Sequence, residues 1–157
     1  MHKELPVRKK IRLEGYDYTG NGAYFVTLCV KDRQPILWEQ NVGAISNRPN
    51  IKLSKIGINA ENAISELNEK IAIDKYVIMP NHIHMIVRIE SSGRTEFAPT
   101  ISSIIRFYKS CLTKQLGYSI WQKSYHDHII RSEEDYRRYW QYIDENPVKW
   151  AEDEYFK

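Results

Sequence analysis

Two kinds of hydrophobic pattern follow one another along this chain. Short runs rich in β-branched, aromatic and aliphatic residues predict strands over residues 24–30, 71–79, 82–90 and 125–131. Longer segments in which apolar residues recur every three or four positions predict three helices: residues 55–70, from Thr100 or Ser102 to about 116, and from Ser132 to about 146. Ser54 and Ser132 are suitable helix caps, and Gly117 suits the residue after a helix end.

The predicted elements follow the order β-α-β-β-α-β, with one further helix at the end. This order favours a ferredoxin-like (RRM-like) α+β sandwich, in which two helices cover one face of an antiparallel sheet. We expect one domain over residues 1–157, with residues 1–22 as a basic lead-in segment that ends at a glycine-containing turn. The other face of the sheet would be open to a ligand.

Composition narrows the function classes only modestly. The 157 residues carry a formal net charge of +3 and include 11 tyrosines and four tryptophans. A mildly basic, aromatic-rich chain is compatible with nucleic-acid binding, although tyrosine is also ordinary core material. The two cysteines, Cys29 and Cys111, belong to no C-x-x-C pair, which indicates reduced thiols. Since the chain starts with charged residues and has no long apolar segment, we expect a cytoplasmic protein without membrane contact.

The strand predicted over 82–90 carries two histidines two residues apart. Side chains on a strand alternate faces, so His82 and His84 point the same way with Cα atoms about 7 Å apart. Ile83, Met85 and Val87 share the opposite, apolar face and should pack under the helices. The histidines are then expected on the helix-free face. Two imidazoles at this reach can hold a divalent cation, and a pair of hydrogen-bonded surface histidines is the alternative interpretation.

The last predicted helix carries a tyrosine beside its apolar stripe. At about 100° per residue, Tyr142 and Asn146 are neighbours on one face, offset from Ile143. A phenol has a pKa of about 10 and is a weak nucleophile unless its surroundings assist the reaction. A cation nearby could stabilise charge developing on a phosphate attacked by the phenol. A half-exposed tyrosine that covers a groove is the structural alternative.

Four groups of residues along the chain form a combined pattern. They are Arg12–Tyr18 with Ala23–Thr27, Tyr76–His84, Trp121–Arg131 and Tyr142–Trp150, and they cover roughly residues 11–153. Together and in this order they resemble a known family, the REP-associated tyrosine transposases, which are single-tyrosine HUH transposases similar to the IS200 type.

The resemblance implies a metal-dependent endonuclease and strand transferase that cleaves single-stranded DNA at or near REP-type hairpins. It implies Tyr142 as the nucleophile that forms a 5′-phosphotyrosine intermediate. It also implies His82 and His84 as ligands of Mg²⁺ or Mn²⁺. Asn146 stands where related enzymes use a glutamine, whose side chain is one methylene longer, as the third metal ligand. Water is the alternative ligand at this position. Such enzymes are monomers or homodimers of bacterial cells.

Several alternatives remain open at this stage. His126-Asp127-His128 is a rival metal motif, which we assign to packing or DNA contacts, and Tyr108 and Tyr125 are rival nucleophiles. A hairpin-binding module without catalysis, or an RNA-recognition domain, could use the same architecture. Candidate phosphate contacts are basic residues of the lead-in segment and of the second helix. They are Arg8, Lys9, Lys10, Arg12, Arg106, Lys109 and Lys114.

Overall fold

The computed structural model describes residues 22–39, 51–90 and 99–150. Its strands are β1 (Gly22–Cys29), β2 (Ala72–Ile78), β3 (His82–Ile89) and β4 (His126–Ile130). Its helices are the short 3-10 turn η1 (Lys31–Arg33), α1 (Lys55–Asn68), α2 (Ile101–Leu116) and α3 (Glu133–Glu145). The predicted order of strands and α-helices is therefore confirmed, and the boundaries differ from the prediction by at most two residues.

The four strands form one antiparallel sheet in the order β2-β3-β1-β4. β1 is a central strand: Thr27 pairs with His84 on β3 and with His126 on β4. Opposed residues of an antiparallel pair point to the same face of the sheet. Thr27 of β1 and His126 of β4 therefore lie on the same face of the sheet as His84.

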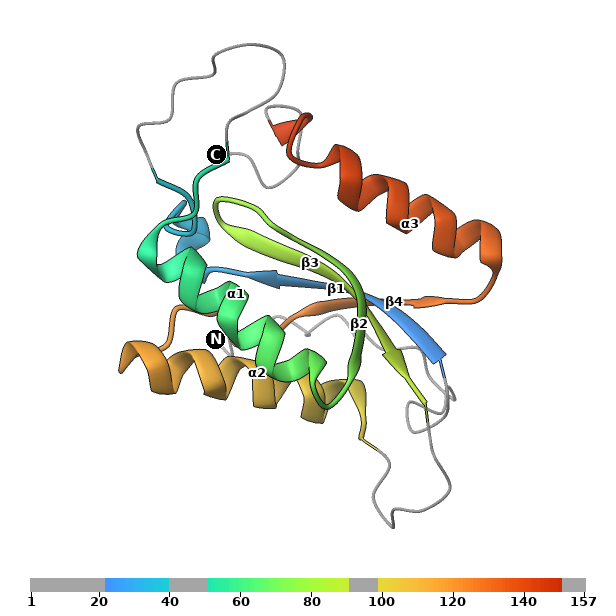
Figure 1. Cartoon of the computed structure of the whole chain (residues 1–157), viewed down its shortest axis with the longest axis horizontal. Helices are drawn as coiled ribbons and strands as arrows, with labels where there is room; N and C mark the ends of the chain where they lie inside the picture. Colours follow the sequence, from blue (N-terminus) through green and yellow to red (C-terminus); the bar gives the residue numbers. More distant parts are fainter. Residues whose placement is uncertain (1–21, 40–50, 91–98, 151–157) are drawn as a thin grey trace, which may run out of the picture.

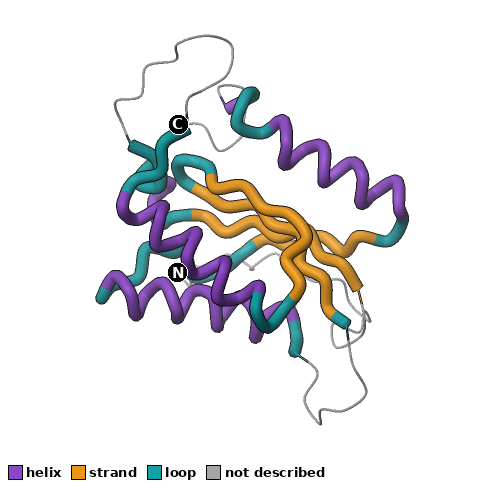
Figure 2. Tube along the Cα trace, in the orientation of Figure 1, coloured by secondary structure: helices purple, strands orange, loops and turns teal. Residues whose placement is uncertain are grey.

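The sheet lies between two layers of helix (Figure 1). α1 and α2 cover one face, while α3 crosses the other face, as Figure 2 also shows. The expectation of a helix-free face for the histidines is therefore wrong. α3 is amphipathic, and burying its apolar side against the sheet is more favourable than leaving both surfaces in water.

The main core lies between the sheet and the α1/α2 layer. Ile83, Met85, Val87 and Ile89 of β3 are all buried there, as their alternation predicts. Ser54 caps α1 by accepting a hydrogen bond from the Gly57 N–H. A Cβ added at position 57 would lie 2.1 Å from the Leu37 carbonyl oxygen. Glycine at this position therefore lets α1 approach the backbone at Leu37 closely.

A smaller apolar cluster holds α3 on the opposite face. Ile143 is buried against Phe25 of β1 and Ile86 of β3. At the start of the helix, the Tyr136 hydroxyl donates a hydrogen bond to the Asp74 carboxylate, with 2.8 Å between the oxygens. Near its end, the Lys75 ammonium lies 2.5 Å from an Asp144 carboxylate oxygen. These contacts fix the helix that carries Tyr142.

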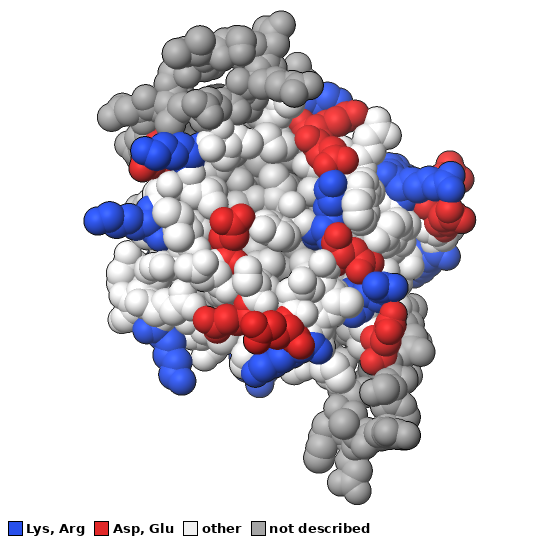
Figure 3. All heavy atoms as spheres, viewed as in Figure 1, with Lys and Arg blue, Asp and Glu red and all other residues white. Residues whose placement is uncertain are grey.

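Acidic and basic side chains are interspersed on the face shown in Figure 3, with no large area of one sign. Residues 1–21 of the predicted lead-in segment lie outside the described residues, and with them the candidate phosphate contacts Arg8, Lys9, Lys10 and Arg12. None of the helices in the described segments is long and apolar enough to cross a membrane.

Candidate functional site

His82 and His84 lie side by side on β3 and are almost completely buried. Their Nε2 atoms are 3.0 Å apart, so both rings aim the same nitrogen at one point. The two rings are within hydrogen-bond distance, as the alternative interpretation expects, but they do not lie on the surface, because α3 and the segment after it cover this part of the sheet. The Trp150 ring lies against His82, with 5.8 Å between ring centroids.

The far nitrogen of each imidazole is held by a neighbouring side chain. His82 Nδ1 donates to Asn81 Oδ1 at 2.8 Å, since an amide oxygen can only accept. The Asn81 amide is itself oriented, because its Nδ2 donates to the Arg33 carbonyl oxygen at 3.3 Å. This arrangement leaves the His82 Nε2 lone pair directed at His84.

Thr27 plays the same part for His84, with 2.8 Å between Thr27 Oγ1 and His84 Nδ1. A hydroxyl can donate or accept. When His84 Nε2–H donates to His82, the hydroxyl donates to Nδ1; when Nδ1 carries the proton, the hydroxyl accepts. When both Nδ1 atoms carry the proton, both Nε2 lone pairs face the same point, and each Nδ1 keeps its hydrogen-bond partner.

Burial lowers the pKa of His84 well below its usual range, and repulsion from His82 lowers it further. The neutral imidazole is the form that binds a metal ion. The site therefore keeps His84 ready to act as a ligand at neutral pH.

Tyr142 reaches this pair from α3. Its ring meets the His84 ring edge-on, with 5.2 Å between centroids, and meets Phe25 at 5.8 Å. The residue is 38% exposed, so its phenol adjoins both the buried imidazoles and solvent. The spacing argument that put Tyr142 beside the apolar stripe of α3 is consistent with this position, whereas Ile143 is buried under the helix.

A pocket of about 530 Å³ opens between β1, β4 and α3 at Tyr142. Its walls are largely aromatic, and β4 contributes the rival histidine motif to it. The lining residues are Phe25, Thr27, His84, His126, Asp127, His128, Tyr139 and Tyr142. His128 is held in place by the Asp135 carboxylate, with 3.1 Å between His128 Nε2 and the oxygen.

The two rival tyrosines lie on the opposite side of the sheet. Tyr108 is fully buried and its hydroxyl donates to the Ala60 carbonyl oxygen, while burial raises its pKa. The Tyr125 hydroxyl lies 2.9 Å from Ser102 Oγ on α2. Neither phenol is grouped with the histidines, whereas Tyr142 is.

No protein-family model matches the chain, but individual proteins do. An uncharacterised protein of Haemophilus influenzae is 30% identical over 173 aligned positions, which cover 95% of this chain and 93% of that protein. A REP-associated tyrosine transposase of Escherichia coli K12 is 37% identical over 78 residues, 49% of this chain and 44% of that protein. A solved structure of a REP-associated tyrosine transposase bound to a REP hairpin superposes with a TM-score of 0.66 and 24% identity, covering 89% of this chain and 74% of that one.

In sequence and in fold the chain is similar to the REP-associated tyrosine transposases. The shared fold is an α+β arrangement with a four-stranded antiparallel sheet and three helices. The family implies a divalent metal ion. Among the described residues, no group of three or more His, Cys, Asp or Glu side chains could hold one, so a third ligand from this part of the chain would be of another type.

Asn146 is a suitable third donor for such an ion. It follows Tyr142 by one turn, and its N–H donates to the Tyr142 carbonyl oxygen at 3.0 Å. Its side chain is buried, yet Oδ1 finds no hydrogen-bond donor among the described residues. A buried amide oxygen without a donor is costly unless something else pairs with it. Two imidazoles and one amide oxygen suit Mn²⁺ better than Mg²⁺.

The basic candidates on α2 are separated from this site by the sheet. Lys109 Nζ donates to the Gln122 and Ser124 carbonyl oxygens at 2.7 and 3.3 Å, and burial lowers its pKa. Arg106 and Lys114 are exposed on the same helix. A phosphate bound there would lie on the opposite face from Tyr142.

Proposed function

We propose that this transposase-family protein is a metal-dependent single-stranded DNA endonuclease and strand transferase that acts at or near REP-type hairpins on a ferredoxin-like frame. One observation carries the proposal: the Tyr142 ring contacts the His84 ring, and His84 Nε2 lies 3.0 Å from His82 Nε2. The related protein with a solved structure is bound to a REP hairpin, which motivates the substrate.

The reaction would be a transesterification, in which the DNA phosphate moves from a 3′ oxygen to the phenol oxygen of Tyr142. The Tyr142 Oη attacks the scissile phosphorus and forms a P–Oη bond, while the bond from phosphorus to the 3′ oxygen breaks. The phenolic proton passes to water, and the departing 3′ oxygen takes up a proton. The 5′-phosphotyrosine remains a phosphodiester, so a 3′ hydroxyl can reverse the step without ATP.

The protein side chains divide the work between them. His82, His84 and Asn146 would hold the divalent ion, which when bound neutralises charge on the phosphate oxygens. Asn81 and Thr27 fix the two imidazoles, and Phe25, which stacks on the Tyr139 ring, contacts the Tyr142 ring edge-on. The pocket beside Tyr142 has the aromatic walls on which a base next to the scissile phosphate could stack.

The decisive experiment uses a labelled single-stranded REP-type hairpin with Mn²⁺ and a search for an adduct that survives denaturation. We expect an adduct with the native chain, its loss in EDTA, and its loss in Tyr142→Phe. Tyr139→Phe is the matched control, because it removes a neighbouring phenol of α3 and should retain the adduct.

Hairpin binding is measured in parallel with the same variants. Tyr142→Phe should bind the hairpin as well as the native chain, since only the nucleophilic oxygen is lost. If the native chain binds the hairpin but forms no adduct with any divalent ion, the protein is a non-catalytic hairpin-binding module and the enzymatic proposal fails.

A further inference from the structure

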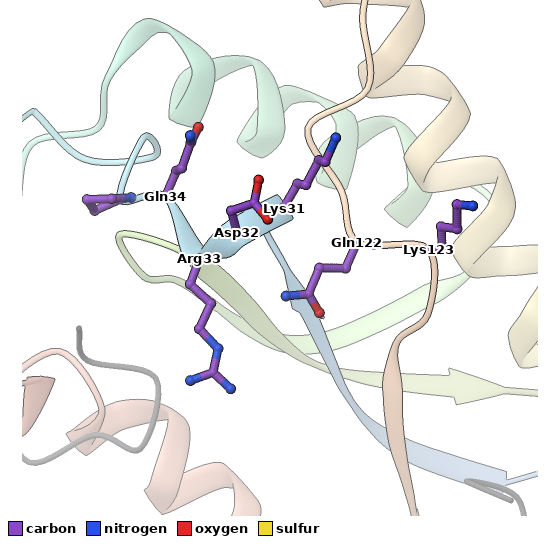
Figure 4. Close-up of a pocket in the computed structure, with 7 residues that line it drawn as sticks. Lys31, Asp32, Arg33, Gln34, Gln122 and Lys123 are labelled. Atoms are coloured by element: carbon purple, nitrogen blue, oxygen red, sulfur yellow. The ribbon is translucent and has the colours of Figure 1, made fainter. Parts of the chain in front are cut away.

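A basic turn follows β1 and borders a second pocket of the molecule. The pocket, of about 850 Å³, is formed by the turn, Lys31–Pro35, together with Gln122 and Lys123. Figure 4 shows Arg33 and Gln122 extending to one side of the turn and Lys31 to the other. Three of its side chains are cationic, and Asp32 is the one acidic residue among the seven that line it.

The backbone of this turn adopts a conformation that is unusual for arginine. Asp32 and Arg33 have φ values of 55° and 52°, in the left-handed region that aspartate tolerates and arginine rarely adopts. The turn is closed by hydrogen bonds from Arg33 N to Val30 O at 3.0 Å and from Gln34 N to Lys31 O at 3.4 Å. A long charged side chain is therefore kept at a position where glycine would be less strained, which points to a use for the side chain.

The turn is joined directly to the histidine pair. Asn81 donates through Nδ2 to the Arg33 carbonyl oxygen at 3.3 Å and accepts through Oδ1 from His82. In addition, the Val30 N–H donates to the Asn81 carbonyl oxygen at 2.9 Å. One side chain thus separates the basic turn from His82, so a DNA strand that leaves the histidine site needs to travel only a short way to reach it.

We propose that the basic turn, Lys31–Pro35 with Gln122 and Lys123, binds backbone phosphates of the single-stranded DNA that flanks the scissile phosphate. This inference rests on the proposed function for the identity of the ligand. Guanidinium and ammonium groups on an open pocket suit phosphate oxygens, and the two glutamine amides suit sugar or base edges. The open shape suits an extended strand that passes across it.

Salt dependence provides a quantitative test. For single strands, each phosphate neutralised contributes about 0.7 to the slope of log affinity against log salt. Arg33→Gly should reduce that slope by about 0.7 and weaken binding about tenfold, the order expected for one charge-assisted hydrogen bond. Arg33→Lys should restore most of the slope.

The binding experiment uses the full chain and fluorescence anisotropy, with hairpins whose 5′ or 3′ single-stranded tails are shortened stepwise. Removing the tail that reaches the turn should erase the difference between the native chain and Arg33→Gly, and it identifies which tail this is. Arg137→Gln is the control, because Arg137 lies on the exposed side of α3, paired with Glu133 at 2.5 Å. It should change neither the affinity nor the salt slope.

Stability separates a DNA contact from a structural role. Because glycine tolerates the left-handed conformation, Arg33→Gly adds no backbone strain and should remain folded, with a cooperative urea transition. Weaker DNA binding by this folded variant, restored by Arg33→Lys, supports the proposal. Unchanged affinity for every tailed hairpin overturns it. Adduct formation is measured separately from binding. If Arg33→Gly reduces the salt slope but the native chain forms no adduct, the proposed catalysis is refuted and the proposed phosphate contact is not.

Discussion

The hydroxyl of Thr27 is the most informative group to remove, since within the described residues its hydrogen bond is to His84. Thr27 is 3% exposed, and its Oγ1 lies 2.8 Å from His84 Nδ1. Thr27→Val exchanges the hydroxyl for a methyl group of similar size. Because valine is at least as favourable as threonine in a strand, strand propensity does not contribute a loss.

The expected magnitude follows from the hydrogen bond that is lost. A buried ring nitrogen without a partner costs about 1–3 kcal/mol of folding free energy. For a bound cation, loss of the group that orients a histidine ligand reduces affinity about 10–100-fold. Both effects should occur together, because the same bond fixes the ring in the fold and aims Nε2 at His82.

The assays are urea unfolding in EDTA and calorimetric titration with Mn²⁺, and Thr27→Ser is the control. Serine keeps the oxygen, so Mn²⁺ affinity should stay close to that of the native chain. Native-like Mn²⁺ affinity in Thr27→Val, with binding still dependent on His84, would refute the reasoning that this hydroxyl positions the imidazole.

Three further predictions concern α3. Ile143→Ala removes a buried side chain from a small cluster that can partly collapse. We expect the free energy of unfolding, measured with urea, to fall by about 2–3 kcal/mol, and amide exchange in α3 to become faster. Unchanged exchange would contradict the docking of α3 by Ile143. Burial and the neighbouring Asp74 carboxylate raise the pKa of Tyr136 to about 12, above the usual value of about 10 for tyrosine. The contribution of this phenol to folding stability is therefore complete below a pH of about 10 and is lost as the pH rises through about 12. The difference in tyrosinate absorbance between the native chain and Tyr136→Phe should then titrate near 12; titration near 10 would refute the contact. Asn146→Leu should lower Mn²⁺ affinity without reducing the urea midpoint in EDTA, because it removes an amide oxygen that has no donor among the described residues; a reduced midpoint would mean that the amide is structural.

The sequence predicted those features that depend on a fixed period. Side-chain alternation placed His82 and His84 together and put Ile83 on the core face, and both assignments hold. Helical spacing put Tyr142 outside the apolar stripe of α3, and the structure leaves it half-exposed beside His84. In these cases local geometry alone decides the direction of a side chain.

Features that depend on which elements become neighbours were not predicted. The apolar stripe of α3 shows that the helix is buried on one side, but not that it packs on the histidine face. Likewise, Thr27 and His126 reach the site only because β1 pairs with both β3 and β4. The strand order would have revealed them, since Thr27 is directly opposed to His84.

The central claim is that a cation held by two imidazoles serves the phenol of Tyr142, and peptide mapping of the trapped adduct tests it most directly. After incubation with a hairpin and Mn²⁺, nuclease and trypsin treatment should leave nucleotide mass on the peptide that begins at Tyr139 and ends at Lys149. Fragmentation should place that mass on Tyr142, and Tyr139→Phe should leave it there. Nucleotide on Tyr139, Tyr125 or any residue other than Tyr142 would contradict the account.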